Sequence, residues 1–442
     1  MSQRRLAVRR RSNAPVPAPG PLHRVAMPVV AIDPGFLPTT RQMALAVADR
    51  LDAYYTPYVA NAGSPLLALP RVGRQLVRRT LPPELASKAR LRETGTEMLR
   101  LSLARAGVHA LDYQLIWRRN IRLDAHLPSE LQAGGIVIGQ YGGCLESFRR
   151  SRGLDGRNVL DYPIARVEYA NQLLAEEAAL RPDFADTILG TSLALEHRER
   201  ISAELQLADM IVVGSRFASD SFDGAVDPQR VRVVRYGVDT VTFRPRVAPR
   251  AEGPLRVLFA GQLTQRKGVA YALDAMRLLD RSKFRLVLCG TAVGSGRGLA
   301  AYDGEFEQIA GARPQDMPQV YGGADVLVLP SLIEGSALVV LEAMASGIPV
   351  IVTPNAGADA VRDGIDGFVV PLRSPEAIAA RLEQLRLDPD LRERMGAAAR
   401  GRSEAFTWAA FRRNFRVELG LPADTRDQGD AGDSPAREER SA

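Results

Sequence analysis

The chain has 442 residues, 46% of them hydrophobic and 25% charged, and a formal net charge of +7. This length predicts two domains, the composition is typical of a soluble globular protein, and no apolar run approaches the ~18 residues of a membrane span. The two distant cysteines, Cys144 and Cys289, exclude a disulfide framework and favour a reducing cytoplasm, and the four histidines lack metal-ligand spacing.

Both ends of the chain are predicted to be disordered. Residues 1–24 carry six arginines and no acid but lack the apolar core of a signal peptide, and residues 421–442 are polar without periodicity.

A second basic stretch runs from Arg71 to Gly107, with nine Arg or Lys residues against three Glu and with Leu and Val between them. It is either a solvated helical face or a surface that docks on anionic lipid or on an acidic acceptor. The second interpretation places the protein peripherally on the inner face of the cell membrane. Nucleic acid is not expected as a partner, because no aromatic and basic platform accompanies the charge.

The N-terminal half alternates short apolar runs with stretches of helical spacing. Strands are predicted within residues 24–33, 134–143, 208–213 and 231–239, and helices over 39–51, 167–180 and 197–208. This alternation predicts an α/β domain over residues 25–245 with a largely parallel sheet.

A Pro-rich stretch from Thr242 to Pro254 marks the domain boundary. Beyond it, strands are predicted within residues 254–263, 283–290, 324–331, 348–354 and 367–372, and helices over 267–279, 337–346, 357–364, 374–387 and 389–405. We therefore expect a second doubly wound α/β domain over 250–405. Two such domains facing across a cleft bind ligands at the carboxyl ends of their strands.

The segment from Leu329 to Val352 carries the first candidate site residues. Ser336 is the predicted N-cap of a helix that Gly347 ends. The unpaired amides of Ser336, Ala337 and Leu338 are expected to form an anion site. Glu334 lies just before this site, where its carboxylate could hold the hydroxyls of a sugar.

Glu342 lies inside the same predicted helix, among apolar residues, and a buried carboxylate needs a partner. The partner is either an arginine in a buried salt bridge or a pair of ligand hydroxyls, such as those of a ribose. An anion with a ribose on one side and a sugar on the other describes a sugar nucleotide.

A sugar nucleotide needs positive charge beside its diphosphate, and the segment Phe259–Gly268 supplies it. Gly261 follows a predicted strand, and Arg266 and Lys267 precede the next helix. The chain holds only three lysines, so an ammonium group placed next to a guanidinium favours a specific role on a diphosphate.

These motifs, "GQLTQRKG", "LPSLIEGSALVVLEAMASGIPVIVTPNAG" and "VRDGIDGFVVP", resemble the C-terminal half of a retaining GT-B glycosyltransferase of the family 4 type, glycosyl transferases group 1. The E-x7-E signature of that family falls on Glu334 and Glu342. The resemblance is clear from Leu255 to Phe406, and "MIVVGSRFASDSF" and "VRVVRYGVD" extend it to the end of the first half.

The resemblance implies a role for each matched residue. Arg266 and Lys267 would hold the donor diphosphate, Glu334 the donor-sugar hydroxyls near the reacting carbon, and Glu342 the ribose. The donor would also meet Gly261, the amides of Ser336, Ala337 and Leu338, and, near its base, Gly290 and residues 309–311. The resemblance further implies retention of configuration, no metal or cofactor, and a helix over 406–420 that crosses back to the first domain.

The N-terminal half departs from the family at two places. Many members carry a Gly-Gly pair in the first loop, where this chain has only Gly35. Many carry a histidine at the end of a central strand, where Asp161 stands here. We assign both residues to the site.

Two further motifs are set aside. "VGSGRG" (293–298) does not open a helix after the first strand, so it does not predict a dinucleotide site. "DPD" (388–390) matches a metal-binding D-x-D but is explained by an Asp at a helix start.

The sequence therefore predicts transfer of a hexose from a nucleoside diphosphate sugar to a carbohydrate or lipid-linked acceptor, in bacterial cell-surface polysaccharide synthesis. Two alternatives stay open: an epimerase of the same fold, and a nucleotide-sugar-binding protein with a silent site.

Overall fold

The structure, a computed structural model, describes residues 27–59, 79–105, 111–127, 131–188, 195–247 and 253–422. The N-terminal arm, nearly all of the C-terminal tail and parts of the basic stretch lie outside the described residues.

The first domain is built on a seven-stranded sheet in the order β3-β2-β1-β4-β5-β6-β7, in which every pairing is parallel. Its strands are mostly buried, as expected for a parallel sheet covered on both faces. They are β1 (Val29–Ile32), β2 (Leu51–Thr56), β3 (Ala89–Leu91), β4 (Ile136–Gln140), β5 (Arg157–Asp161), β6 (Met210–Val213) and β7 (Val231–Val233).

The helices of this domain include two that the sequence pattern predicted almost to the residue, α7 and α8. The described α-helices are α1 (Pro38–Ala46), α3 (Pro83–Ala86), α4 (Thr94–Arg105), α5 (Asp112–Ala125), α6 (Leu145–Arg152), α7 (Val167–Leu180), α8 (Leu195–Leu207) and α9 (Arg216–Asp220). The helix predicted over 39–51 was too long. It ends at Ala46, and Leu51 begins β2, whose buried residues pair with β1.

The second domain has a six-stranded parallel sheet in the order β10-β9-β8-β11-β12-β13. Its strands are β8 (Leu255–Ala260), β9 (Phe284–Cys289), β10 (Phe306–Ile309), β11 (Val326–Leu329), β12 (Val350–Val352) and β13 (Gly367–Val369). The exposed edge strand β10 was not predicted, because Glu307 and Gln308 interrupt its apolar pattern.

Helices surround this second sheet in the order that the sequence predicted, with α11 and α12 added. They are α10 (Val269–Arg277), α11 (Arg297–Ala300), α12 (Met317–Gly322), α13 (Leu338–Ala345), α14 (Pro375–Leu387) and α15 (Pro389–Ser403). The short helix predicted over 357–364 is only a 3-10 turn at Ala358–Ala360. Asp388 caps α15, accepting a hydrogen bond from the amide of Leu391 at 2.8 Å, as predicted for the "DPD" motif.

Each sheet has one point where the strand order reverses, between β1 and β4 in the first domain and between β8 and β11 in the second. Loops that leave neighbouring strands on opposite faces diverge there, so ligands of doubly wound sheets bind at this point. The loop after β8 carries Arg266 and Lys267, and the loop after β11 carries Glu334.

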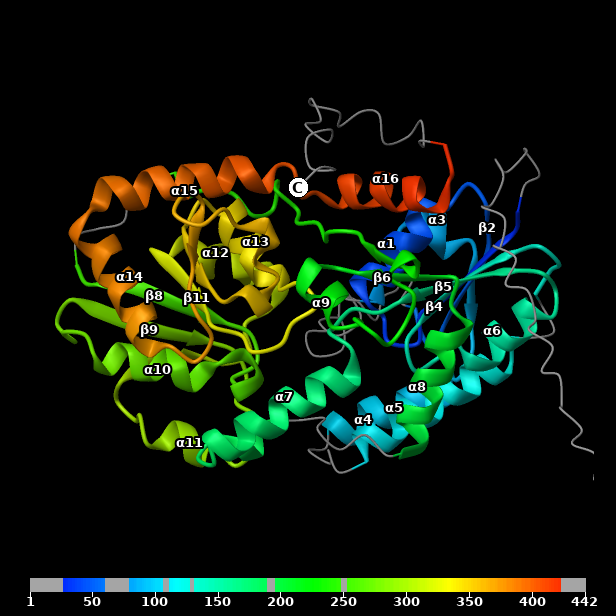
Figure 1. Cartoon of the computed structure of the whole chain (residues 1–442), viewed down its shortest axis with the longest axis horizontal. Coiled ribbons are helices and arrows are strands. Elements are labelled where there is room, and N and C mark those ends of the chain that lie inside the picture. Colours follow the sequence, from blue (N-terminus) through cyan, green and yellow to red (C-terminus); the bar gives the residue numbers. More distant parts are fainter. Residues whose placement is uncertain are drawn as a thin grey trace, which may run out of the picture.

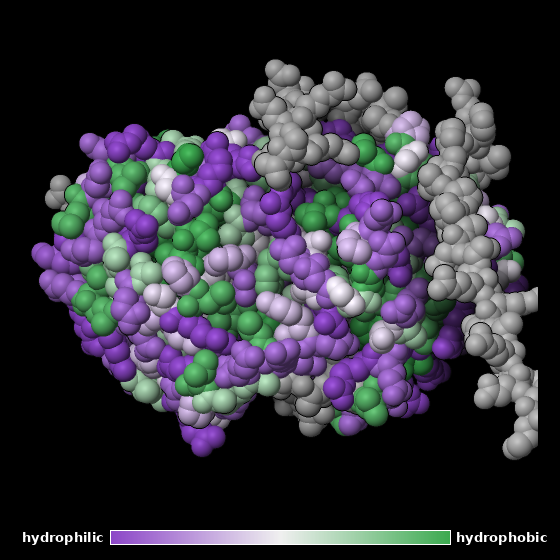
Figure 2. Space-filling model, viewed as in Figure 1, coloured by the Kyte–Doolittle hydropathy of each residue, from purple (hydrophilic) through white to green (hydrophobic). Residues whose placement is uncertain are grey.

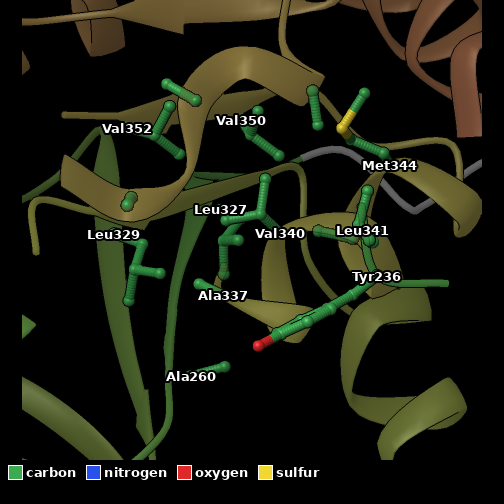
Figure 3. Packing of buried hydrophobic residues seen from close by; sticks show 14 of the residues in the cluster. Tyr236, Ala260, Leu327, Leu329, Ala337, Val340, Leu341, Met344, Val350 and Val352 are labelled. Carbon is green, nitrogen blue, oxygen red and sulfur yellow. The ribbon is translucent and has the colours of Figure 1, made fainter. Parts of the chain in front are cut away.

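The core of the second domain continues into the first. Figure 3 shows apolar side chains of α13, β11 and β12 packed together, with the ring of Tyr236 beside them and its hydroxyl directed toward Ala260 and Ala337. Tyr236 follows β7 of the first domain, so its side chain joins the two sheets.

The last helix, α16 (Trp408–Leu419), returns to the first domain. In Figure 1, α15 and α16 run one after the other along the same side of both domains. The buried guanidinium of Arg416 donates to the carbonyl of Ala46, at the end of α1, at 2.6 Å and pairs with Asp49 at 2.7 Å.

No helix in the described ranges has both the length and the apolar character needed to cross a membrane. The face in Figure 2 is mixed, with small hydrophobic patches between hydrophilic residues.

Candidate functional site

The reversal point of the second sheet brings together the two loops that the sequence singled out. Lys267 Nζ donates to Glu334 Oε1 at 2.6 Å, and Arg266 Nη1 donates to the same oxygen at 3.0 Å. Arg266 Nη1 also donates to the carbonyl of Ile333 at 2.7 Å. Among the described residues nothing donates to the second oxygen of Glu334, Oε2.

The charge of Glu334 is stabilised by these cations. Burial raises the pKa of its carboxyl, but Lys267 and Arg266 outweigh burial and bring the pKa below its usual value. The group is therefore a carboxylate that can accept hydrogen bonds from hydroxyl groups.

The glycines at the ends of β8 and β9 allow this close packing. Gly261 has φ +127, and a Cβ on it would lie 3.0 Å from Lys267 Cε. A Cβ on Gly290 would lie 1.7 Å from the carbonyl oxygen of Gly261. The amide of Gly290 donates to Ile309 O at 3.0 Å, so the two segments expected near the base do lie side by side.

The start of α13 differs from the prediction in two respects. Ser336 is not the N-cap: the helix begins at Leu338, and Ala337 is its N-cap residue. The amide of Ala337 is not free either, because it donates to Ala356 O at 3.2 Å. Among the described residues, no hydrogen bond occupies the amides of Ser336, Leu338 and Val339. Two of the three expected donors, Ser336 and Leu338, are therefore free within that part of the chain, and Val339 offers a third in place of Ala337.

Glu342 does not form the salt bridge that was one of its two predicted partners. Within the described part of the chain, the hydroxyl of Tyr321 donates to Glu342 Oε2 at 2.7 Å, and no Arg or Lys pairs with it. Burial raises the pKa of Glu342, and the Tyr321 hydroxyl partly opposes that rise. The carboxyl group therefore keeps one oxygen for a ligand.

In the first domain, Gly35 follows β1, and its backbone amide already makes a hydrogen bond. Its amide donates to Gln140 Oε1 at 3.0 Å, and a Cβ on Gly35 would meet that side chain at 2.6 Å. The two residues stand at the reversal point between β1 and β4.

Asp161 ends β5 and is fully buried. Its Oδ2 accepts hydrogen bonds from the hydroxyls of Thr39 and Thr40, both at 2.6 Å, while Oδ1 has no partner among the described residues. The pKa of Asp161 is raised to about 6, because burial, with a smaller contribution from Asp33, outweighs the lowering by the two threonine hydroxyls. The carboxyl group lies against the two threonines in the first turn of α1, at the positive end of that helix.

The two domains touch at the loop that carries Glu334. A Cβ on Gly335 would lie 1.9 Å from the carbonyl oxygen of Pro163, and the hydroxyl of Ser215 donates to Gly335 O. Sequence reasoning singled out neither contact, since Pro163 and Ser215 lie far from Gly335 along the chain.

Tyr236 was also missed. Its hydroxyl is buried and takes no hydrogen bond among the described residues, while Asp161 and Glu334 both raise its pKa after the larger effect of burial. The hydroxyl therefore lies near the carboxylates of both domains.

The arrangement can hold a polyanion with hydroxyl groups at its ends: two cations, free helix amides and two carboxylates that accept hydrogen bonds. No group of three or more His, Cys, Asp or Glu residues that could hold a metal ion occurs in the described residues.

Comparisons with known proteins agree with this location. Residues 254–388 match the family described as Glycosyl transferases group 1. The chain is 36% identical over 207 residues to a D-inositol 3-phosphate glycosyltransferase of Streptomyces scabiei, covering 41% of this chain and 46% of that protein. It is 30% identical over 263 residues to the protein of the same name from Corynebacterium kroppenstedtii, covering 52% and 58%. The chain thus spans about half the length of the curated relatives it matches.

Solved structures match nearly the whole chain. HepE of Anabaena in complex with UDP gives a TM-score of 0.60 at 13% identity and covers 89% of this chain and 99% of its own. Sucrose-phosphate synthase of Thermosynechococcus elongatus gives 0.60 at 20% identity and covers 89% and 97%. The predicted fold class, GT-B with two Rossmann-like domains, is confirmed.

Proposed function

We propose that the protein is a retaining glycosyltransferase that moves a hexose from a nucleoside diphosphate sugar to a carbohydrate or lipid-linked acceptor. The observation that carries the proposal is the contact of Lys267 and Arg266 with Glu334 at the reversal point of the second sheet. The family match to residues 254–388 and the relatives' names support the reaction class.

Each site residue has a distinct task in this proposal. Arg266 and Lys267 bind the diphosphate and stabilise the negative charge that develops on it as the sugar leaves. Glu334, through Oε2, accepts hydrogen bonds from sugar hydroxyls next to the reacting carbon. Glu342, oriented by Tyr321, accepts from the ribose hydroxyls.

The acceptor side belongs to the first domain in this proposal. The departing diphosphate takes the proton of the acceptor hydroxyl on the face it leaves, which retains the configuration without a metal ion. In this proposal Gly35 positions the loop after β1 through its contact with Gln140. It does not bind a phosphate, because its amide is occupied.

The test is the release of nucleoside diphosphate by the purified protein from a panel of UDP, GDP and ADP sugars, with and without a bacterial lipid extract. We expect release from one donor, an increase with the extract and loss in Glu334→Ala. Glu305→Ala, which removes an exposed ion pair with Arg277 in the same domain, is the matched control. Nucleotide binding without any release would instead support a silent binding protein.

We also propose a weak association with anionic membranes, although two arginines of the basic stretch, Arg79 and Arg100, are neutralised by a carboxylate. The buried carboxylate of Glu97 pairs with Arg79, Arg100 and Arg119 at 2.5 to 2.8 Å. The exposed remainder includes Arg90 beside Leu91, and Met98 and Leu99 on α4. Binding to vesicles should require anionic lipid and weaken with salt, and binding that depends on neither would contradict the proposal.

A further inference from the structure

One segment of the first domain, residues 161–187, touches both site loops of the second domain. It begins at Asp161, and its Pro163 carbonyl lies against Gly335 in the Glu334 loop. It then forms α7, which Figure 1 shows reaching from the first domain toward α11. It ends at Thr187, whose Oγ1 accepts a hydrogen bond from the amide of Gln265 at 2.9 Å.

Glu177, on α7, makes the central contact of this segment. Its side chain is fully buried and accepts from three side chains of the second domain. Gln265 Nε2 donates to Oε1 at 2.6 Å, the Tyr271 hydroxyl donates to Oε1 at 2.7 Å, and Arg373 Nε donates to Oε2 at 2.8 Å. We call these four side chains the Glu177 cluster.

The cluster adjoins the diphosphate-binding cations directly. Gln265, Arg266 and Lys267 form one 3-10 turn, and Gln265 Oε1 also accepts from the amide of Ala270 at the start of α10. The orientation of Gln265 therefore fixes the turn that carries both cations. Its side-chain amide is held from both domains: Nε2 donates to Glu177 of the first domain, and Oε1 accepts from Ala270 of its own.

Three further features lie at this contact. Arg373 has φ 58, a left-handed conformation that is unfavourable for a residue with a Cβ and is characteristic of functionally constrained positions. The glycine-rich segment 293–298 packs against the same part of the first domain, because a Cβ on Gly294 or Gly298 would lie within 3 Å of Asp186 or Asp183. Arg181 adds an ion pair with Asp274 at 2.7 Å.

We propose that Glu177 is a positioning residue of the transferase: from the first domain it sets the placement of Arg266 and Lys267 on the donor diphosphate. This inference rests on the proposed function. Because a misplacement of about 1 Å in a positioned group can lower a rate by about 100-fold, a contact at Gln265, next to Arg266 and two residues before Lys267, affects catalysis without touching the donor. If the domains separate, Gln265 loses its hydrogen bond to Glu177, and the turn Gln265–Lys267 is no longer held from the first domain.

The test compares Glu177→Ala with Glu176→Gln. Glu176 is the preceding residue, is 55% exposed and lies 4.0 Å from Arg373 Nη2, so its variant is the matched control. Hydrogen–deuterium exchange of the peptide spanning 262–272 is measured first, followed by kinetics with the donor that the panel identifies.

In Glu177→Ala we expect exchange of this peptide to rise about tenfold, the effect of losing a charge-assisted hydrogen bond, with peptides of the sheet cores unchanged. We expect kcat with the donor to fall at least about tenfold while KM for the acceptor stays the same. Glu176→Gln should match the wild-type protein in both measurements.

The exchange measurement tests whether Glu177 supports the turn even if no donor is turned over, because it does not depend on the proposed function. Unchanged exchange at 262–272, or an equal rise throughout the chain, would overturn the inference. If Glu177→Ala does not fold, Tyr271→Phe removes a single hydroxyl from the cluster. That variant should raise exchange in the same peptide, and its failure to do so would overturn the inference as well.

Discussion

At the scale of single residues, the two carboxyl groups of the site, Glu334 and Glu342, differ in the groups that pair with them. Glu334 keeps its charge because two cations pair with one of its oxygens, whereas within the described ranges Glu342 has only the hydroxyl of Tyr321 as a partner. In the proposed function, the same cations bind the diphosphate of the donor. Binding of a nucleotide sugar would then redistribute contacts that already exist.

Glu334→Gln separates these two roles. The amide removes a negative charge beside the diphosphate site, so affinity for UDP, or for the nucleotide that the panel identifies, should stay the same or increase. The hydroxyls of the donor sugar lose the carboxylate that accepts their hydrogen bonds, so kcat should fall by about 100-fold or more. Calorimetry and steady-state kinetics measure the two effects. Equal losses of affinity and rate would contradict the assignment.

Asp161 makes stability depend on pH. Its pKa rises from 3.8 to about 6 on folding, so between these values the folded state binds more protons than the unfolded state. Its contribution to stability is therefore largest at low pH and is lost as pH rises toward 6.

Asp161→Asn removes this titration and keeps an acceptor for Thr39 and Thr40. Relative to the wild-type protein, the variant should gain on the order of 1–3 kcal/mol in free energy of unfolding at pH 8, and the gain should vanish near pH 4. Urea unfolding at both pH values measures it. Asp390→Asn, at an exposed helix start, is the control, and a gain independent of pH would contradict the prediction.

At the scale of elements, glycines decide how closely the site loops approach one another. Gly261, Gly290 and Gly335 each stand where a Cβ would meet another part of the site at 3.0 Å or less. Their positions after strands could be predicted from the sequence. The atoms they approach could not, because those contacts join different strands and different domains.

Gly335→Ala should separate the two domains at the Glu334 loop, because the added Cβ meets the backbone of Pro163 at 1.9 Å and backbone cannot rotate away. We expect a larger radius of gyration by small-angle X-ray scattering and a turnover reduced about tenfold or more. Gly322→Ala is the control, since its Cβ would have no neighbour within 4 Å. A variant with unchanged dimensions and turnover would show that the loop adapts locally.

At the scale of the whole molecule, helix α16 links the end of the second domain to the first. Arg416 connects α16 to the end of α1. This residue is 2% exposed and donates to the carbonyls of Ala46 and Pro422 as well as to Asp49. These acceptors lose a buried partner if the guanidinium is removed.

Arg416→Met should therefore lower the free energy of unfolding by about 2–4 kcal/mol and expose α16 to limited proteolysis. Arg386→Met, which removes a partly exposed i,i+3 pair with Glu383 on α14, should change stability by less than about 1 kcal/mol. Similar effects of the two substitutions would indicate that α16 does not depend on this anchor.

Sequence alone determined the two α/β domains, the order of most strands and helices, and the grouping of Arg266, Lys267 and Glu334. These follow from local periodicity and from residues that stand directly after strands, since parallel strands bring their carboxyl ends to one edge of a sheet. Tertiary structure decided the rest: that Ala356 occupies the amide of Ala337, that Tyr321 is the partner of Glu342, and that β10 pairs at the sheet edge. The partners of Glu177 stand 88, 94 and 196 positions away along the chain. No local pattern encodes such a contact, because it exists only once both sheets have formed and packed together.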